Sequence, residues 1–115
     1  MNKIFLFTLI PFILISQNNK DIFTMFYNVE NLFDTINNPM TNDNEFLPNS
    51  KKKWNTQKYH HKIEQLTKIF ASINDEEYPN IIGLCEVENK SVIEDLLEQP
   101  FFHQHNYTII HNNSP

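Results

Sequence analysis

The sequence predicts a mixed α/β fold (α/β or α+β) with a mainly parallel sheet. Short runs rich in β-branched and aromatic residues alternate with longer segments whose apolar residues recur at helical spacing. The runs lie at 22–29, 81–85 and 107–111, and the helical segments follow residues 55 and 89. Because strand, helix and strand follow one another as in a βαβ unit, we expect the first two strands to be parallel.

Composition limits the classes of function. The chain has 115 residues, of which 40% are hydrophobic, so it forms one small domain or part of a larger one. Its formal net charge is −5, and its nine basic residues are all lysine. An acidic surface does not attract polyanions over long range. This argues against a non-specific nucleic-acid coat protein, but not against an enzyme that meets phosphate through a bound cation.

Residues 1–16 have the features of a secretory signal peptide. Lys3 supplies a positive charge, and residues 4–15 are almost entirely apolar. That run is shorter than the ~20 residues needed to span a bilayer. We therefore expect cleavage after Ser16, a mature part at 17–115 with no stable membrane span, and a secreted or periplasmic location. An uncleaved anchor or a buried N-terminal strand is the alternative.

The first strand is predicted at Ile22–Val29, with the polar Asn28 near its end. The segment Thr35–Lys53 is rich in Asn and Pro and predicts a long surface loop. The three lysines that close this loop are expected to be solvated rather than to contact phosphate.

Two helices are predicted from caps and apolar spacing. Asn55 or Thr56 can cap the first helix, and Asn89 or Ser91 can cap the second. The first helix carries one apolar stripe, made of Tyr59, Ile63, Leu66, Phe70 and Ile73. In the second helix we expect Val92, Ile93, Leu96 and Leu97 to face inward and Glu94 and Asp95 to face solvent, with Pro100 as the stop.

The run Ile81–Cys85 is typical of a strand buried on both faces of a parallel sheet. Its single cysteine is expected to be a core residue. Glu86 follows directly, so its carboxylate should lie at the edge where open α/β sheets bind ligands. Asn28 closes the first strand, and parallel strands would bring both side chains to the same edge.

An amide and a carboxylate at this edge have the chemistry that phosphate-ester hydrolysis needs. A carboxylate can hold Mg²⁺, which prefers oxygen ligands and retains several waters. The amide can orient a phosphate oxygen or a neighbouring side chain without adding repulsion. From spacing alone, capping of the following helices by the same residues is the favoured explanation.

Two motifs add a family resemblance. The stretches FYNVENLFD at 26–34 and PNIIGLCEVEN at 79–89 resemble early motifs of the endonuclease/exonuclease/phosphatase superfamily. The resemblance implies that Asn28, an active-site amide, and Glu86 are both catalytic residues and both ligands of the metal. It also implies Mg²⁺ or Mn²⁺ as cofactor, and nucleic acid or another phosphodiester as substrate. Cys85 stands where the family commonly has Gln.

The resemblance further implies a four-layer sandwich of two sheets flanked by helices, of which this chain would be the N-terminal part. The family's later Gly-Asp-x-Asn and Asp-His motifs do not occur, so we expect this part to be inactive alone. His103 and His105 are expected to be surface residues rather than a metal pair. The leading interpretation is a secreted, metal-dependent endonuclease. The alternative is a non-catalytic secreted α/β binding module, or a degenerate relic whose strand-end acids only cap helices.

Overall fold

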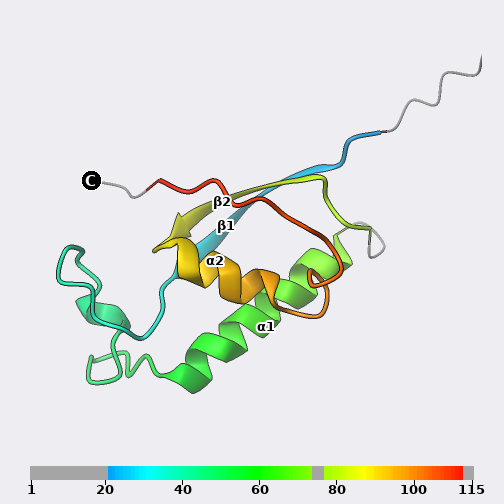
Figure 1. The fold of residues 1–115 in the computed structure, drawn as a ribbon. Coiled ribbons are helices and arrows are strands. Elements are labelled where there is room, and N and C mark those ends of the chain that lie inside the picture. Colours follow the sequence, from blue (N-terminus) through cyan, green and yellow to red (C-terminus); the bar gives the residue numbers. More distant parts are fainter. Residues whose placement is uncertain (1–20, 74–76, 113–115) are drawn as a thin grey trace, which may run out of the picture.

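The computed structural model describes residues 21–73 and 77–112 (Figure 1). Its elements are β1 (Thr24–Leu32), the 3-10 helix η1 (Asn44–Phe46), α1 (Thr56–Ser72), β2 (Ile81–Val87) and α2 (Lys90–Leu97). The predicted mixed α/β class is confirmed. The predicted signal peptide lies outside the described residues. In the described part, no helix has the length and apolar character needed to cross a membrane.

The strands β1 and β2 are parallel, as predicted, and pair from Thr24 with Ile81 to Asn28 with Cys85. The bounds of β1 differ from the prediction of Ile22–Val29. The strand begins two residues later and continues to Leu32, because pairing resumes there with Val87 after an irregularity. Asn28 therefore lies within β1 rather than at its end.

Both helices lie on the same side of the strand pair (Figure 1). The hydrophobic core between the helices and the strand pair consists of Met25, Val29, Leu32, Tyr59, Ile63, Leu66, Phe70, Val92, Leu96 and Phe102. Asn55 caps α1 by accepting a hydrogen bond from Lys58 N, and Asn89 caps α2 in the same way from Val92 N. Burying one stripe of each helix against β1 accounts for the single core.

Two details of the helix predictions are wrong. Ile73, expected on the buried stripe, is 44% exposed because α1 ends at Ser72. Asp95, expected in solvent, is half-buried because its carboxylate accepts a hydrogen bond from the Tyr59 hydroxyl. This contact joins α2 to α1 at a polar point beside the core.

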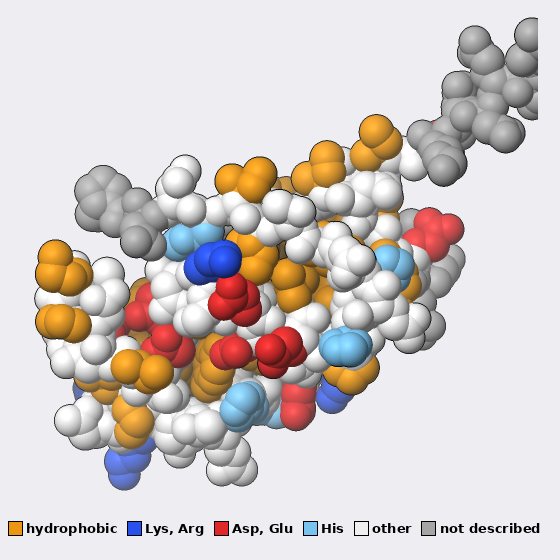
Figure 2. Space-filling view, in the orientation of Figure 1, with side chains coloured by type: hydrophobic (Ala, Val, Ile, Leu, Met, Phe, Trp, Pro, Cys, Tyr) orange, Lys and Arg blue, Asp and Glu red, His pale blue; other side chains and the backbone are white. Residues whose placement is uncertain are grey.

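The opposite face of the strand pair is open in the described part of the chain. Phe26 is 74% exposed and Ile81 is 56% exposed, and the other residues of β2 are half-buried or exposed. The prediction that this strand is buried on both faces is therefore wrong for the described residues, since their helices cover one face. Figure 2 shows hydrophobic side chains along the upper edge of the view, where the strands and the extended segment at 107–112 lie.

The predicted third strand at Tyr107–His111 is not observed. These residues run beside β2 (Figure 1), yet they form no ladder with it and Ile110 is 90% exposed. Tyr107 is held instead by its side chain, whose hydroxyl donates to Pro79 O at 2.6 Å. The sequence has strand-like residues here, but without backbone pairing they remain an extended segment.

Candidate active site

Asn28 and Glu86, the two predicted site residues, are in direct contact. Asn28 Nδ2 donates a hydrogen bond to Glu86 Oε1 at 2.8 Å, although 58 positions separate the residues in the chain. Both side chains are exposed to solvent. The parallel pairing of β1 with β2 brings them together at the carboxyl end of the strand pair, where α/β sheets place ligands.

A bulge follows Asn28 in β1. Between its pairing with Cys85 and the pairing of Leu32 with Val87, β1 advances four residues while β2 advances two. The extra residues include Glu30 and Asn31, which have φ of 52° and 61°. Residues other than glycine seldom adopt this left-handed conformation, although Asn tolerates it better than most. A bulge at a strand end changes the direction of nearby side chains and backbone groups. Its left-handed residues are unfavourable by themselves, so surrounding contacts must stabilise them.

The bulge points two backbone N–H groups at the site. Glu30 N donates to Asn28 Oδ1 at 2.7 Å, and Asn31 N donates to Glu86 Oε2 at 3.1 Å. Each oxygen of the Glu86 carboxylate thus accepts one hydrogen bond, which fixes the orientation of the group. The role of the Asn31 backbone N–H was not predicted from the sequence, because only the preference of Asn for the left-handed region hints at it.

Glu86 itself has φ of 62°. Because Asn28 pairs with Cys85, regular alternation along β2 would send Glu86 to the other face of the sheet. The left-handed backbone at Glu86 interrupts this alternation and permits the side chain to reach Asn28. The contact therefore depends on irregular backbone in both strands.

The carboxylate of Glu86 fits one position in the shell of a hard divalent cation. Each oxygen retains acceptor capacity after its hydrogen bond, and the group is open to solvent. In residues 21–73 and 77–112, no group of three His, Cys, Asp or Glu side chains is placed to hold a metal. Glu86 would thus supply one ligand of a Mg²⁺ ion, which commonly takes one or two carboxylates and keeps several waters.

Asn28 turns its amide nitrogen toward Glu86, and its Oδ1 accepts from Glu30 N. An amide nitrogen is a donor and does not ligate a cation. This arrangement favours an orienting role for Asn28. Its role as a metal ligand stays a prediction.

A second carboxylate, Glu88, anchors the segment that follows β1. Glu88 Oε2 accepts a hydrogen bond from Asp34 N at 2.9 Å, and Asp34 Oδ2 accepts from Asn89 Nδ2 at 3.0 Å. Asp43, from the long loop, is 2% exposed, and its Oδ2 accepts from Asn38 N. Burial raises the pKa of Glu88 above the ordinary 4.5, and the charges of Asp34 and Asp43 also raise it, against the lowering effect of the Asp34 N–H.

This shift predicts a pH dependence of stability. With a raised pKa, the folded state binds more protons than the unfolded state in the range between pH 4.5 and the folded pKa. The contribution of Glu88 to the free energy of unfolding is therefore lost as pH rises through its folded pKa. We expect Glu88→Gln to remove this loss, so that the variant gains stability relative to the wild type as pH rises.

Urea denaturation of both proteins between about pH 4 and pH 8 measures this difference. Glu98→Gln, which removes an exposed carboxylate at the end of α2, is the control. A difference between Glu88→Gln and wild type that stays constant, or that falls with pH, would contradict the assignment.

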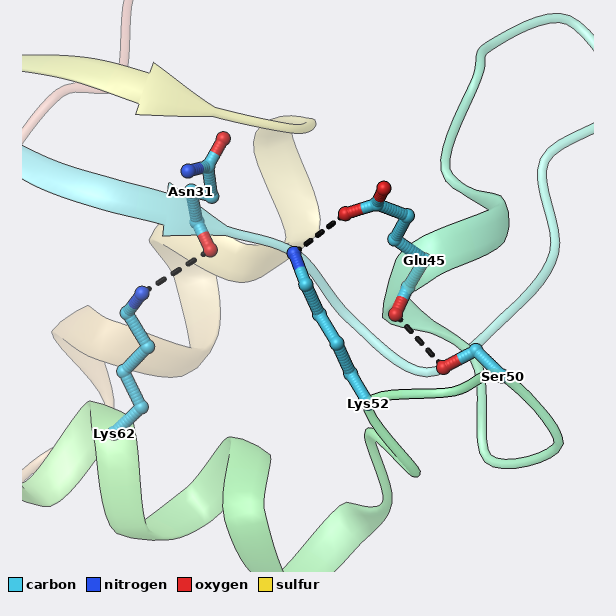
Figure 3. A network of polar contacts seen from close by, with 5 residues as sticks. All are labelled: Asn31, Glu45, Ser50, Lys52 and Lys62. Atoms are coloured by element: carbon cyan, nitrogen blue, oxygen red, sulfur yellow. Dashed lines mark hydrogen bonds and ion pairs between the residues drawn. The ribbon is translucent and has the colours of Figure 1, made fainter.

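The other polar candidates do not join the site. His103 and His105 are exposed, as expected, and lie in the turn after α2. Of the three lysines before α1, Lys52 forms an ion pair with Glu45 at 2.6 Å within the long loop (Figure 3). Acidic side chains outnumber basic ones around α2 in Figure 2, consistent with the negative net charge.

The chain is an α/β protein with a polar site at the edge of its sheet. Its two strands are parallel, its helices lie on one side of them, and an amide and a carboxylate are in contact at the carboxyl end of the strand pair. The chain belongs to the Endonuclease/Exonuclease/phosphatase family, whose model matches residues 23–115. Members are hydrolases of phosphodiesters and phosphate esters and generally use a divalent metal. No curated protein and no solved structure matches the chain in the corresponding comparisons.

Proposed function

We propose that this chain carries part of the active site of a Mg²⁺-dependent phosphodiesterase, specifically an endonuclease. The observation that supports it most is the fixed carboxylate of Glu86, held by Asn28 Nδ2 at 2.8 Å and by Asn31 N at 3.1 Å. Groups that hydrogen-bond a metal ligand orient it and tune its affinity. Helix capping does not explain Glu86, because Asn89 caps α2.

The site residues would have different roles. Glu86 would hold the cation, and Asn28 and the Asn31 N–H would keep its carboxylate in one orientation. When bound, the divalent ion supplies stabilisation of the negative charge that develops on the phosphoryl group and its leaving oxygen. Mn²⁺ offers similar oxygen coordination and should substitute.

We propose nucleic acid as the substrate because the family includes endonucleases and exonucleases. With a net charge of −5, the chain has no general attraction for a polyanion. Productive contact with phosphate would then depend on the bound cation. Omitting the metal should therefore weaken substrate binding as well as turnover.

Nicking of supercoiled plasmid by the full-length protein tests the proposal. We expect cleavage in Mg²⁺ or Mn²⁺, loss of cleavage in EDTA, and recovery when excess Mg²⁺ is added. Parallel reactions with RNA, a phospholipid and a small phosphate diester separate the substrate classes. Cleavage of the phospholipid or small ester without cleavage of nucleic acid would overturn the endonuclease assignment, and hydrolysis unaffected by EDTA would overturn the metal dependence.

Export is a separate proposal that depends on the composition of residues 1–16. We expect the exported protein to begin at residue 17. N-terminal sequencing that still finds Met1 on the exported protein would contradict signal-peptide cleavage.

A further inference from the structure

A single lysine of α1 reaches the bulge that follows Asn28. Lys62 Nζ donates hydrogen bonds to Asn31 O at 3.1 Å (Figure 3) and to Glu30 O. The two carbonyls belong to the two left-handed residues of the bulge. Lys62 thus joins the carboxyl end of β1 to α1.

With this lysine, side chains hold every backbone polar group of the two residues. The N–H groups of Glu30 and Asn31 donate to Asn28 and Glu86, and both carbonyls accept from Lys62. A strand normally satisfies such groups through its ladder, which is interrupted here. The left-handed conformation therefore depends on the site residues on one side and on Lys62 on the other.

The surroundings of Lys62 restrict its movement. The side chain is half-buried, and Nζ lies 5.9 Å from the centroid of the Trp54 ring. Trp54 Nε1 in turn donates to Phe33 O at 3.0 Å, so the start of α1 is fastened to the chain just beyond β1. Burial lowers the pKa of Lys62, while the carboxylates of Glu30 and Glu86 oppose this effect.

We propose that Lys62 is a positioning residue for the metal site: by holding the Glu30 and Asn31 carbonyls, it keeps the Asn31 N–H directed at Glu86. This inference rests on the proposed function, since it concerns the affinity of Glu86 for a divalent cation. Removing the ammonium would release two carbonyls and allow the bulge to relax. The Glu86 carboxylate would then lose one of its two fixed donors.

Lys58 provides a matched control on the same helix. One turn before Lys62, its Nζ also donates to a backbone carbonyl, that of Lys52, at 2.7 Å. That carbonyl belongs to the end of the long loop and not to the bulge. Lys58→Met therefore removes a comparable charge and hydrogen bond without touching the site.

The test compares wild type, Lys62→Met, Lys62→Arg and Lys58→Met as full-length proteins. Calorimetric titration with Mn²⁺ alone gives the affinity, and hydrogen exchange of the Asn31 amide in metal-free protein reports the bulge directly. We expect Lys62→Met to weaken Mn²⁺ binding about tenfold, as is typical when a supporting group of a metal ligand is lost, and to speed exchange at Asn31. Lys62→Arg, whose guanidinium can donate to both carbonyls, should retain most of the wild-type Mn²⁺ affinity and most of the protection of the Asn31 amide from exchange. Lys58→Met should match wild type.

The outcomes separate this inference from the proposed function. If the wild type binds Mn²⁺, and Lys62→Met has the same Mn²⁺ affinity and the same Asn31 exchange rate as the wild type, the inference about Lys62 is overturned. The proposed function would stand in that case. An equal loss in Lys58→Met would also overturn it, because the effect would then be a general one of charge or helix stability. Absence of Mn²⁺ binding by the wild-type protein would overturn the proposed function, and this inference with it.

Discussion

Replacing Glu86 with Gln is expected to lower kcat of the full-length protein by about 100- to 1,000-fold, because a catalytic metal contributes several kcal/mol and about 1.4 kcal/mol corresponds to a factor of ten. Gln keeps the size of the side chain and one acceptor oxygen for Asn28. It removes the negative charge that would hold the cation, and it replaces the oxygen that accepts from Asn31 N with a donor. The activity that remains should need more Mg²⁺ for half-maximal rate. Initial rates over a range of Mg²⁺ concentrations measure both effects.

Glu64→Gln is the control for this experiment, since Glu64 is an exposed carboxylate of α1. We expect its kcat and its Mg²⁺ dependence to match wild type. If Glu86→Gln hydrolyses substrate at a near-normal rate, Glu86 is not the metal ligand. If both variants lose activity equally, the loss reflects total charge rather than the site.

Replacing Phe70 with Ala is expected to lower the free energy of unfolding by about 3–5 kcal/mol, the range for deletion of a buried aromatic ring. Phe70 is 1% exposed and lies where α1 meets β1 and the segment after α2. Its ring contacts Tyr27 edge-on, with centroids 5.2 Å apart, and Phe102 with centroids 5.9 Å apart. Deleting it leaves a cavity between α1, β1 and the segment after α2. Urea denaturation followed by circular dichroism measures the loss.

Ile69 precedes Phe70 on α1 and is 38% exposed, so Ile69→Ala provides the comparison. Less apolar surface is lost there, and the change should cost well under half as much as Phe70→Ala. Equal losses in the two variants would mean that Phe70 does not hold the sheet against the helices.

The regular elements could be predicted because their patterns are local. In α1, apolar residues from Tyr59 to Phe70 recur at helical spacing behind the Asn55 cap, and the structure buries that stripe. The change from apolar to polar residues near the end of each predicted strand indicated the contact of Asn28 with Glu86, since parallel strands end at the same edge.

The irregular parts could not be predicted, because they depend on contacts between distant segments. After Asn28, only the tolerance of Asn31 for left-handed backbone hints at a bulge, and no local pattern indicates that Lys62, more than 30 positions away, holds its carbonyls. The left-handed backbone at Glu86 likewise appears only when the strands are paired. At Tyr107–His111 the composition favoured a strand, but strand formation needs a partner, and none pairs with these residues in the described structure.

The position of a bound divalent ion is the most direct test of the account. Crystals of the full-length protein soaked in Mn²⁺, with data collected at a wavelength where manganese scatters anomalously, would locate the ion. We expect an anomalous peak within coordination distance of a Glu86 carboxylate oxygen, with Asn28 and the Asn31 N–H still hydrogen-bonded to that carboxylate. A well-occupied manganese site elsewhere in the molecule, with Glu86 bound only to solvent, would contradict it.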